Sequence, residues 1–104
     1  MDIISICLPE RIELVKKLES DIKHHIQIFN AIQGSTEQYN GFTHILKSET
    51  ITNGMVGCLE SHLQVLRDAK TNICIFEDDC EYVSNFSQFL SLVPDFDILC
   101  LGTN

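Results

Sequence analysis

The sequence predicts an α/β domain with a mainly parallel sheet, and three observations support this prediction. Short apolar runs rich in β-branched residues, typical of buried strands, occur at 3–7, 26–29 and 73–76. Segments with the apolar spacing of helices lie between them, at about 9–23 and 52–69. Three acidic residues follow the third run directly. Strands that alternate with helices in this way form parallel sheets joined by crossover connections.

The first helix is expected directly after the first strand. Pro9 suits the first turn of a helix, where its missing N–H leaves no hydrogen bond unmade. Apolar residues then recur at the spacing of one helix face: Ile12, Val15, Leu18 and Ile22. The second strand follows this helix at 26–29.

A long loop is expected between the second strand and the second helix. Glycine, asparagine, serine and threonine are frequent in the segment 31–51, which is typical of irregular structure. Thr52 or Asn53 can cap the helix that follows. Its buried stripe is expected to comprise Met55, Leu59, Leu63 and Leu66, flanked by Cys58, His62 and Ala69. On this pattern His62 is interpreted as a core histidine.

The third strand, 73–76, is expected to lie centrally in the sheet. Its buried side chains are expected to be Ile73, Ile75 and Phe76. After the acidic residues, the pattern predicts a short helix over about 86–90 that ends before Pro94. A fourth strand is expected over 96–101.

The composition limits the class of partner. The 104 residues suffice for one small domain, and the apolar content of 44% is ordinary for a globular protein. The formal net charge of −8 argues against nucleic acid and anionic membranes as partners. No stretch is long and apolar enough to span a bilayer, and the N-terminus lacks the basic region of a signal peptide. We therefore expect a cytoplasmic protein without membrane insertion.

The cysteines predict a reduced protein. They are odd in number and widely spaced, and none of them forms a CxxC pair: Cys7, Cys58, Cys74, Cys80 and Cys100. A free cysteine in an apolar run behaves as a small hydrophobic residue. This spacing predicts neither disulfides nor a structural zinc site.

The acidic run Glu77-Asp78-Asp79 is the strongest functional signal from the residues themselves. Ligands of open α/β sheets bind just beyond the carboxyl ends of the strands, where this run is expected to lie. Adjacent carboxylates repel one another unless a positive charge is near, and their oxygens suit a hard divalent cation that can in turn hold a phosphate. The alternative is an acidic turn exposed to solvent.

Five separated stretches carry a family resemblance. They are LPER at 8–11, IFNAIQG at 28–34, GMVGCLESH at 54–62, FEDD at 76–79 and DILCLG at 97–102. In this order and spacing they resemble glycosyltransferase family 25, which includes bacterial lipooligosaccharide galactosyltransferases of lipopolysaccharide biosynthesis and related collagen galactosyltransferases. The glycine, cysteine, serine and histidine of the third stretch, followed by the EDD motif, are the most specific part.

The resemblance implies a Rossmann-like nucleotide-diphospho-sugar transferase fold of the GT-A type. It also implies that 1–104 is the N-terminal, donor-nucleotide-binding part of such a domain, apparently truncated. The implied reaction is an inverting, metal-dependent transfer of a hexose, galactose in the leading hypothesis, from a UDP-sugar to a glycan or protein acceptor. The implied cofactor is a divalent metal ion, Mn²⁺. GT-A folds usually supply the catalytic base from their C-terminal half, so no catalytic residue is assigned.

The resemblance also assigns roles to the acidic run as a DxD-like site. Asp79 is the best metal ligand, Asp78 contacts the ribose or shares the metal, and Glu77 orients the nucleotide. The glutamate in first place departs from a literal DxD motif.

Four further residues are candidates for cofactor binding. Arg11, just after the first strand, can reach the nucleotide phosphates, or it is a solvated arginine. Gly54 and Gly57 allow a close approach of the helix backbone to an anion, or Gly57 serves tight helix–sheet packing. Ser61 and His62 point about 100° apart on a helix, so only one of them faces the pocket squarely.

Two other classes of function compete with this hypothesis. A non-catalytic remnant or interaction module retains the fold without transferase activity. A phosphorelay receiver is disfavoured, because its acidic pair ends the first strand. The chain ends soon after its last predicted strand, so we expect the 104-residue chain to self-associate or to need a missing C-terminal half. Such a chain would bind the donor without transferring sugar on its own.

Overall fold

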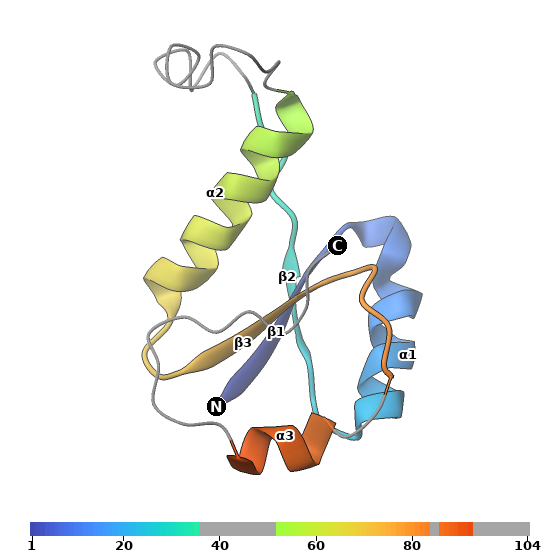
Figure 1. Ribbon diagram of the computed structural model, residues 1–104. Helices are drawn as coiled ribbons and strands as arrows, with labels where there is room; N and C mark the ends of the chain where they lie inside the picture. Colours follow the sequence, from blue (N-terminus) through green and yellow to red (C-terminus); the bar gives the residue numbers. More distant parts are fainter. Residues whose placement is uncertain (36–51, 84–85, 93–104) are drawn as a thin grey trace.

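A computed structural model describes residues 1–35, 52–83 and 86–92 of the chain (Figure 1). Its elements are β1 (Asp2–Cys7), the 3-10 helix η1 (Pro9–Arg11), α1 (Ile12–Ile22), β2 (Gln27–Asn30), α2 (Asn53–Asp68), β3 (Ile73–Glu77) and α3 (Phe86–Leu92). The alternation of strands and helices predicted from the sequence is confirmed. The predicted fourth strand and most of the predicted loop lie outside the described residues.

The three strands form an all-parallel sheet in the order β2-β1-β3. The register pairs Cys7 with Asn30 and Ile6 with Glu77, so the carboxyl ends of the strands lie level with one another. The fold is therefore α/β and Rossmann-like, as predicted. The connection from β2 through α2 passes β1 and reaches the opposite edge of the described sheet.

The predicted central position of the third strand is wrong for the described sheet. β1 takes that position, because it hydrogen-bonds to a neighbour on each side, whereas β3 pairs only with β1 among the described strands. The burial of β3 follows from this position: Cys74 is buried, but Ile73, Ile75 and Phe76 are only partly buried. Sequence hydrophobicity alone does not distinguish a central strand from its neighbour.

The main core lies between the sheet and α1. Val15, Leu18 and Ile22 of α1 are buried, as their spacing predicted. They pack in one cluster with Ile3, Cys7, Ile26 and Cys74, and Phe76 and Phe86 pack against it. The rings of Phe76 and Phe86 lie 5.6 Å apart, which joins α3 to this side of the sheet.

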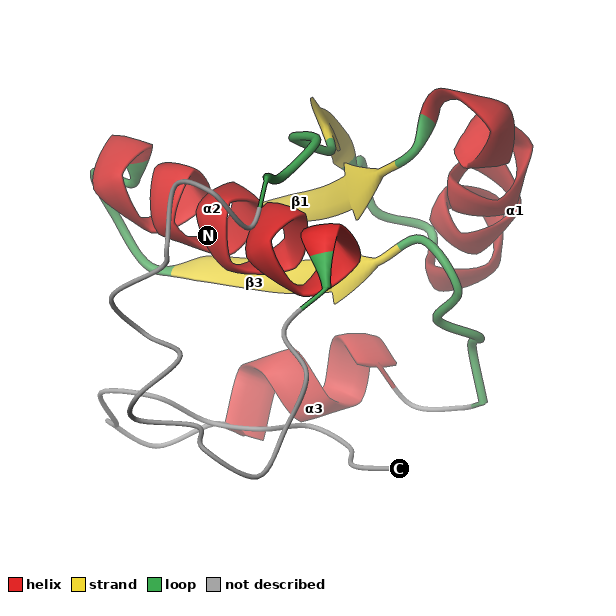
Figure 2. Cartoon of the chain, turned by 90° about the horizontal axis from the view of Figure 1, so that it is seen from above, coloured by secondary structure: helices red, strands yellow, loops and turns green. Residues whose placement is uncertain are grey.

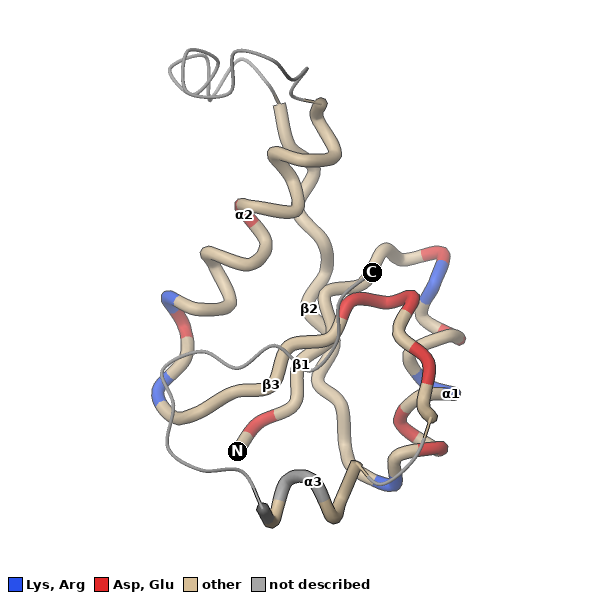
Figure 3. The backbone as a smooth tube through the Cα atoms, in the orientation of Figure 1, with Lys and Arg blue, Asp and Glu red and all other residues tan. Residues whose placement is uncertain are grey.

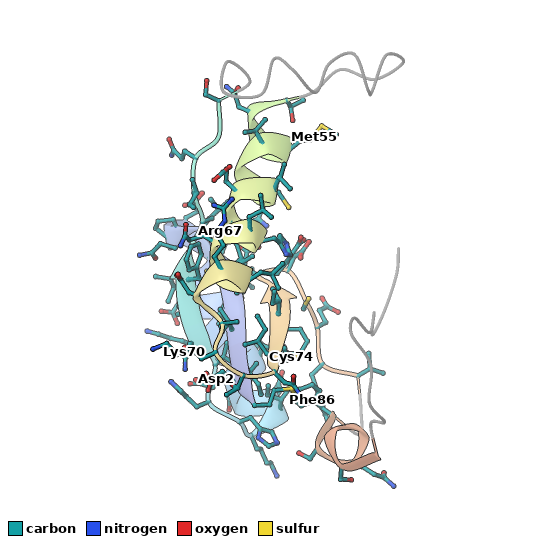
Figure 4. The ribbon with its side chains drawn as sticks, turned by 90° about the vertical axis from the view of Figure 1, so that its left-hand side faces the viewer. Asp2, Met55, Arg67, Lys70, Cys74 and Phe86 are labelled. Atoms are coloured by element: carbon teal, nitrogen blue, oxygen red, sulfur yellow. The ribbon has the colours of Figure 1, made fainter. Side chains whose placement is uncertain are left out.

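α1 and α2 lie on opposite sides of the sheet (Figures 1 and 2). The predicted apolar stripe of α2 is largely wrong: Met55, Leu59 and Leu66 are exposed, and Leu63 is half-buried. Figure 4 shows Met55 projecting from the N-terminal end of the helix, well above the sheet. The buried face instead comprises Val56, Gly57, Ser61 and Val65. The prediction failed because this face packs directly against the backbone of residues 32–34. Only small residues, Gly57 and Ser61, leave room for that contact.

The turn between α1 and β2 depends on Glu19. Lys23 ends the helix in the left-handed conformation at φ 59° and donates its backbone N–H to the Glu19 carbonyl oxygen. The Glu19 carboxylate accepts a hydrogen bond of 2.7 Å from the backbone N–H of Ile26 and lies 2.9 Å from His25 Nδ1. These two partners hold the pKa of Glu19 below its ordinary value of 4.5, the Ile26 hydrogen bond contributing most.

Glu19→Gln is expected to lower stability near neutral pH and to have less effect in acid. Ionised Glu19 stabilises the folded chain fully above about pH 4.5, and this stabilisation is lost as the pH falls through its lowered pKa. Urea unfolding at pH of about 6 and about 3 measures the difference. Glu13→Gln is the control, because exposed Glu13 pairs with the exposed Lys16 at 3.5 Å on the surface of the same helix. An equal effect of Glu19→Gln at both pH values would contradict the prediction.

Candidate functional site

A pocket of about 440 Å³ lies at the carboxyl ends of β1 and β3. Ile6 and Leu8 line it at the end of β1, and Glu77 and Asp78 line it at the end of β3. Residues 31–34 and the first half of α2 complete its wall. In the strand order β2-β1-β3 the direction of winding reverses between β1 and β3, and open α/β sheets bind ligands at such a reversal.

Two glycines, Gly34 and Gly57, allow the two backbone segments that form one wall of this pocket to touch. A Cβ atom added to Gly57 would lie 2.5 Å from the carbonyl oxygen of Ile32 and 3.0 Å from the backbone nitrogen of Gly34. A Cβ atom added to Gly34 would lie 2.2 Å from the nitrogen of Gly57 and 2.5 Å from the carbonyl oxygen of Asn53. The backbone after β2 therefore crosses α2 in direct contact. A side chain at either position would push the two apart.

Ser61 ties the same crossing together. Its hydroxyl accepts a hydrogen bond of 2.9 Å from the backbone N–H of Ile32 and donates one of 2.7 Å to the carbonyl oxygen of Gly57, one turn earlier. The side chain is 1% exposed. Ser61 lines the pocket, as a predicted binding residue should, but its hydroxyl hydrogen is already engaged inside the protein. The next residue, His62, points to Glu77 at the end of β3 instead, and it lines the same pocket.

Ser5→Ala and Ser61→Ala are expected to change stability in opposite directions. Ser5 is fully buried in β1, and its hydroxyl has no hydrogen-bond partner in the described structure, so its removal should raise the free energy of unfolding by about 1 kcal/mol. Ser61→Ala leaves the N–H of Ile32 without its partner and should lower the free energy of unfolding by about 1–3 kcal/mol. Urea unfolding of both variants tests this pair, and a shared sign would contradict it.

The three acidic residues separate in space, although they are adjacent in sequence. Successive residues of a strand point to opposite faces, so Glu77 shares the face of its register partner Ile6, and Asp78 turns toward the end of β1. A backbone hydrogen bond of 3.3 Å from Cys80 N–H to the Glu77 carbonyl oxygen closes a turn that holds Asp79 at the surface. Figure 3 shows this acidic run at the carboxyl end of β3. The separation reduces the repulsion expected from the sequence.

Asp78 joins β3 to the start of the first helix. One carboxylate oxygen accepts a hydrogen bond of 3.0 Å from the backbone N–H of Leu8, and the other lies 3.3 Å from an Arg11 guanidinium nitrogen. The Asp78 side chain is 10% exposed, whereas that of Arg11 is 47% exposed. A nearly buried carboxylate with an N–H donor and a cation is well satisfied. Both residues therefore have a structural role that the sequence did not indicate.

The predicted site residues fall into two groups. Gly54, Gly57, Ser61, Glu77 and Asp78 line the pocket. Arg11 and Asp79 do not line it. Both are nevertheless close to Asp78, because Arg11 contacts its carboxylate and Asp79 is the next residue in the chain. The exposed Asp79 carboxylate makes no hydrogen bond or ion pair within the described ranges, so its oxygens remain available to a cation.

Cys58 and His62 also line the pocket, beside Glu77. His62 Nε2 lies 3.5 Å from Glu77 Oε1, and the Cys58 thiol donates to the same oxygen over 3.8 Å. Partial burial and the neighbouring Glu77 carboxylate raise the pKa of the Cys58 thiol above its ordinary value. The sequence pattern placed both residues beside an apolar stripe, and the interpretation of His62 as a core histidine is wrong, because its side chain is 35% exposed. Their spacing of four on one helix was the available signal that they share a face.

A second hollow, of about 400 Å³, lies along the end of α1 and borders Lys16, Glu19 and Lys23. It lies before the amino end of β2 and therefore away from the level carboxyl ends of the strands. Its polar side chains are those of an ordinary helix surface, so the pocket at β1 and β3 is the candidate site.

The sequence profile of glycosyltransferase family 25 (LPS biosynthesis protein) matches residues 3–99. The chain belongs to glycosyltransferase family 25. This match confirms the resemblance stated from the ordered motifs, and the GT-A type of fold is consistent with the family. No curated protein and no solved structure matches the chain.

Family 25 membership identifies the chain as one of a group of glycosyltransferases, whose reaction transfers a sugar from a donor to an acceptor and releases the remainder of the donor. The pocket at the end of β1 and β3 is built from the stretches that carried the resemblance, 28–34, 54–62 and 76–79. In the described ranges, no helix has the length and apolar character needed to cross a membrane.

Proposed function

We propose that this family 25 chain binds a UDP-sugar in the pocket between β1 and β3 and takes part in transferring its hexose, galactose, to a glycan or protein acceptor. The observation that carries the proposal is the position of the pocket at the reversal of the strand order. Its walls come from three stretches that are far apart in the sequence and shared with the family. This convergence favours a ligand site over a chance surface hollow.

Mn²⁺ is the proposed cofactor, and the residues fit a hard divalent cation. Such ions prefer carboxylate oxygens, and exposed Asp79 offers two that have no partner in the described part of the chain. We assign Asp79 as the principal ligand and Asp78 as the second, since each Asp78 oxygen retains a lone pair beyond its present hydrogen bond. When bound, the ion supplies positive charge that stabilises the leaving nucleotide diphosphate.

The remaining residues bind and orient the donor. Gly54, exposed in the first turn of α2, leaves its backbone open to the pocket, where an anionic phosphate can approach closely, and Gly57 keeps the adjoining wall closed against residues 32–34. Glu77 lies in the pocket with an exposed carboxylate that can accept hydrogen bonds from sugar or ribose hydroxyls. Arg11, held beside Asp78, keeps positive charge next to the metal-binding acids. No base for the acceptor hydroxyl is assigned among these residues.

UDP-galactose is expected to raise the melting temperature of the chain only when Mn²⁺ is present. The net charge of −8 disfavours an anionic ligand unless a cation bridges the two. Asp79→Ala should abolish the shift, whereas Asp2→Ala, which removes an exposed acid at the amino end of β1, should preserve it. Thermal unfolding with and without Mn²⁺ measures both variants. An equal shift without the metal, or no shift with it, overturns the proposal.

A further inference from the structure

Three side chains of the pocket gather in one cluster, and the proposed donor binding uses only one of them, Glu77. Cys58 and His62 lie one turn apart on α2, and Glu77 ends β3. The ligand atoms of the three all lie within 4.8 Å of one another. Each residue is at least partly accessible: His62 is 35% exposed, Glu77 is 56% exposed, and Cys58 is exposed.

Two of the distances within this cluster match those between ligands of one small cation, and the third, from Cys58 to His62, is within 4.8 Å. Nitrogen and oxygen ligands bind Zn²⁺ at about 2.0–2.2 Å and sulfur at about 2.3 Å, so two tetrahedral ligands lie roughly 3.3–3.8 Å apart. The observed separations are 3.5 Å from His62 to Glu77 and 3.8 Å from Cys58 to Glu77. Small movements of exposed side chains are therefore enough to bind an ion.

The donor set selects a class of metal. A thiolate and an imidazole favour borderline ions such as Zn²⁺ and Co²⁺, whereas Mg²⁺ and Mn²⁺ prefer oxygen ligands. The absence of a CxxC pair predicted no structural zinc site, but that argument covers only sites built mainly from cysteines. Here one cysteine joins a histidine and a glutamate from another element.

We propose that Cys58, His62 and Glu77 form a binding site for a transition metal ion such as Zn²⁺, separate from the carboxylates of Asp78 and Asp79. Three protein ligands leave one position of a tetrahedral ion for solvent, and the pocket beside them is open to it. The bound ion joins α2 to the end of β3 and so fixes one wall of the pocket. This site does not depend on the proposed sugar transfer.

Co²⁺ titration of the full chain tests the site, because thiolate ligation of Co²⁺ gives an absorption band that oxygen ligation does not. We expect one equivalent of Co²⁺ to produce the band, with the band lost in Cys58→Ser and the affinity of this site lowered more than about tenfold in His62→Gln. Cys80→Ser is the matched control, since Cys80 is an exposed thiol outside the cluster. It should keep the band and the affinity.

Zn²⁺ should displace the Co²⁺ and raise the melting temperature of the unsubstituted chain, since it binds the folded state. The shift should disappear in His62→Gln, which provides a second readout if Cys58→Ser fails to fold. A missing band in the unsubstituted chain, a band retained in Cys58→Ser, or equal loss in Cys80→Ser overturns the inference. All of these measurements omit UDP-sugars, so they test the metal site even if the chain does not bind a UDP-sugar. Likewise, absence of this metal site would not decide whether the chain binds a UDP-sugar.

Discussion

Gly57→Ala should lower the free energy of unfolding by about 2 kcal/mol or more and should remove binding in the pocket. The new Cβ would lie 2.5 Å from the carbonyl oxygen of Ile32 and 3.0 Å from the nitrogen of Gly34, and both atoms belong to the backbone. Overpacking of this kind typically costs about 1–3 kcal/mol. A backbone atom cannot turn aside as a flexible side chain can, so the helix and the crossing segment must separate.

The expected loss of stability in Gly57→Ala is opposite to the intrinsic preference of helices for alanine over glycine. Alanine stabilises an exposed helix position by up to about 1 kcal/mol relative to glycine. Gly54→Ala is therefore the matched control: it lies three residues earlier in α2, is exposed, and has Thr52 Oγ1 as its nearest neighbour at 3.8 Å. It should leave stability unchanged or slightly raised. Urea unfolding compares the two variants, and equal behaviour of both would show that the crossing is not tight.

The same substitution should also affect the pocket. Separation of α2 from residues 31–34 stretches the hydrogen bond of 2.9 Å from the Ile32 N–H to Ser61. Because both segments line the pocket, the separation also changes the shape of the pocket. The thermal shift produced by UDP-galactose and Mn²⁺ should therefore be lost in Gly57→Ala at a temperature where the variant is folded.

Asp78→Ala should lower the free energy of unfolding by about 1–3 kcal/mol. The substitution leaves the backbone N–H of Leu8 without its acceptor and removes the partner of Arg11. The bond to Leu8 accounts for most of the expected loss, because Arg11 is half-exposed and solvent can replace its contact. Asp78→Asn should lose less, since an amide oxygen can still accept the hydrogen bond from Leu8.

Asp79→Ala provides the control at the next position. Its carboxylate is exposed, so its loss should leave stability nearly unchanged or slightly raised as repulsion between adjacent acids decreases. Chemical unfolding without metal separates the two roles: Asp78→Ala should be destabilised and Asp79→Ala should not. If Asp79→Ala were the more destabilised variant, the assignment of Asp78 as the residue joining β3 to β1 would be wrong.

Local patterns determined the elements of this fold. The apolar spacing in α1 predicted its buried face, because one dominant stripe of large side chains faces the sheet: Val15, Leu18 and Ile22. Thr52 was a predicted cap of α2, and its side chain accepts the Met55 N–H. The ordered motifs identified the family, since exact residues at set spacings carry more information than hydrophobicity. These features depend on residues that are close in sequence.

Tertiary contacts decided what the pattern of large apolar residues could not show. α2 turns Gly57 and Ser61 inward instead of Met55 and Leu59, because the backbone of residues 31–34 needs the space. β1 is the central described strand because the chain crosses it between β2 and β3. Strand alternation and packing then separate Glu77, which meets Cys58 and His62, from Asp78, which binds Leu8 and Arg11. Such pairings join residues up to 70 positions apart, and no local period encodes them.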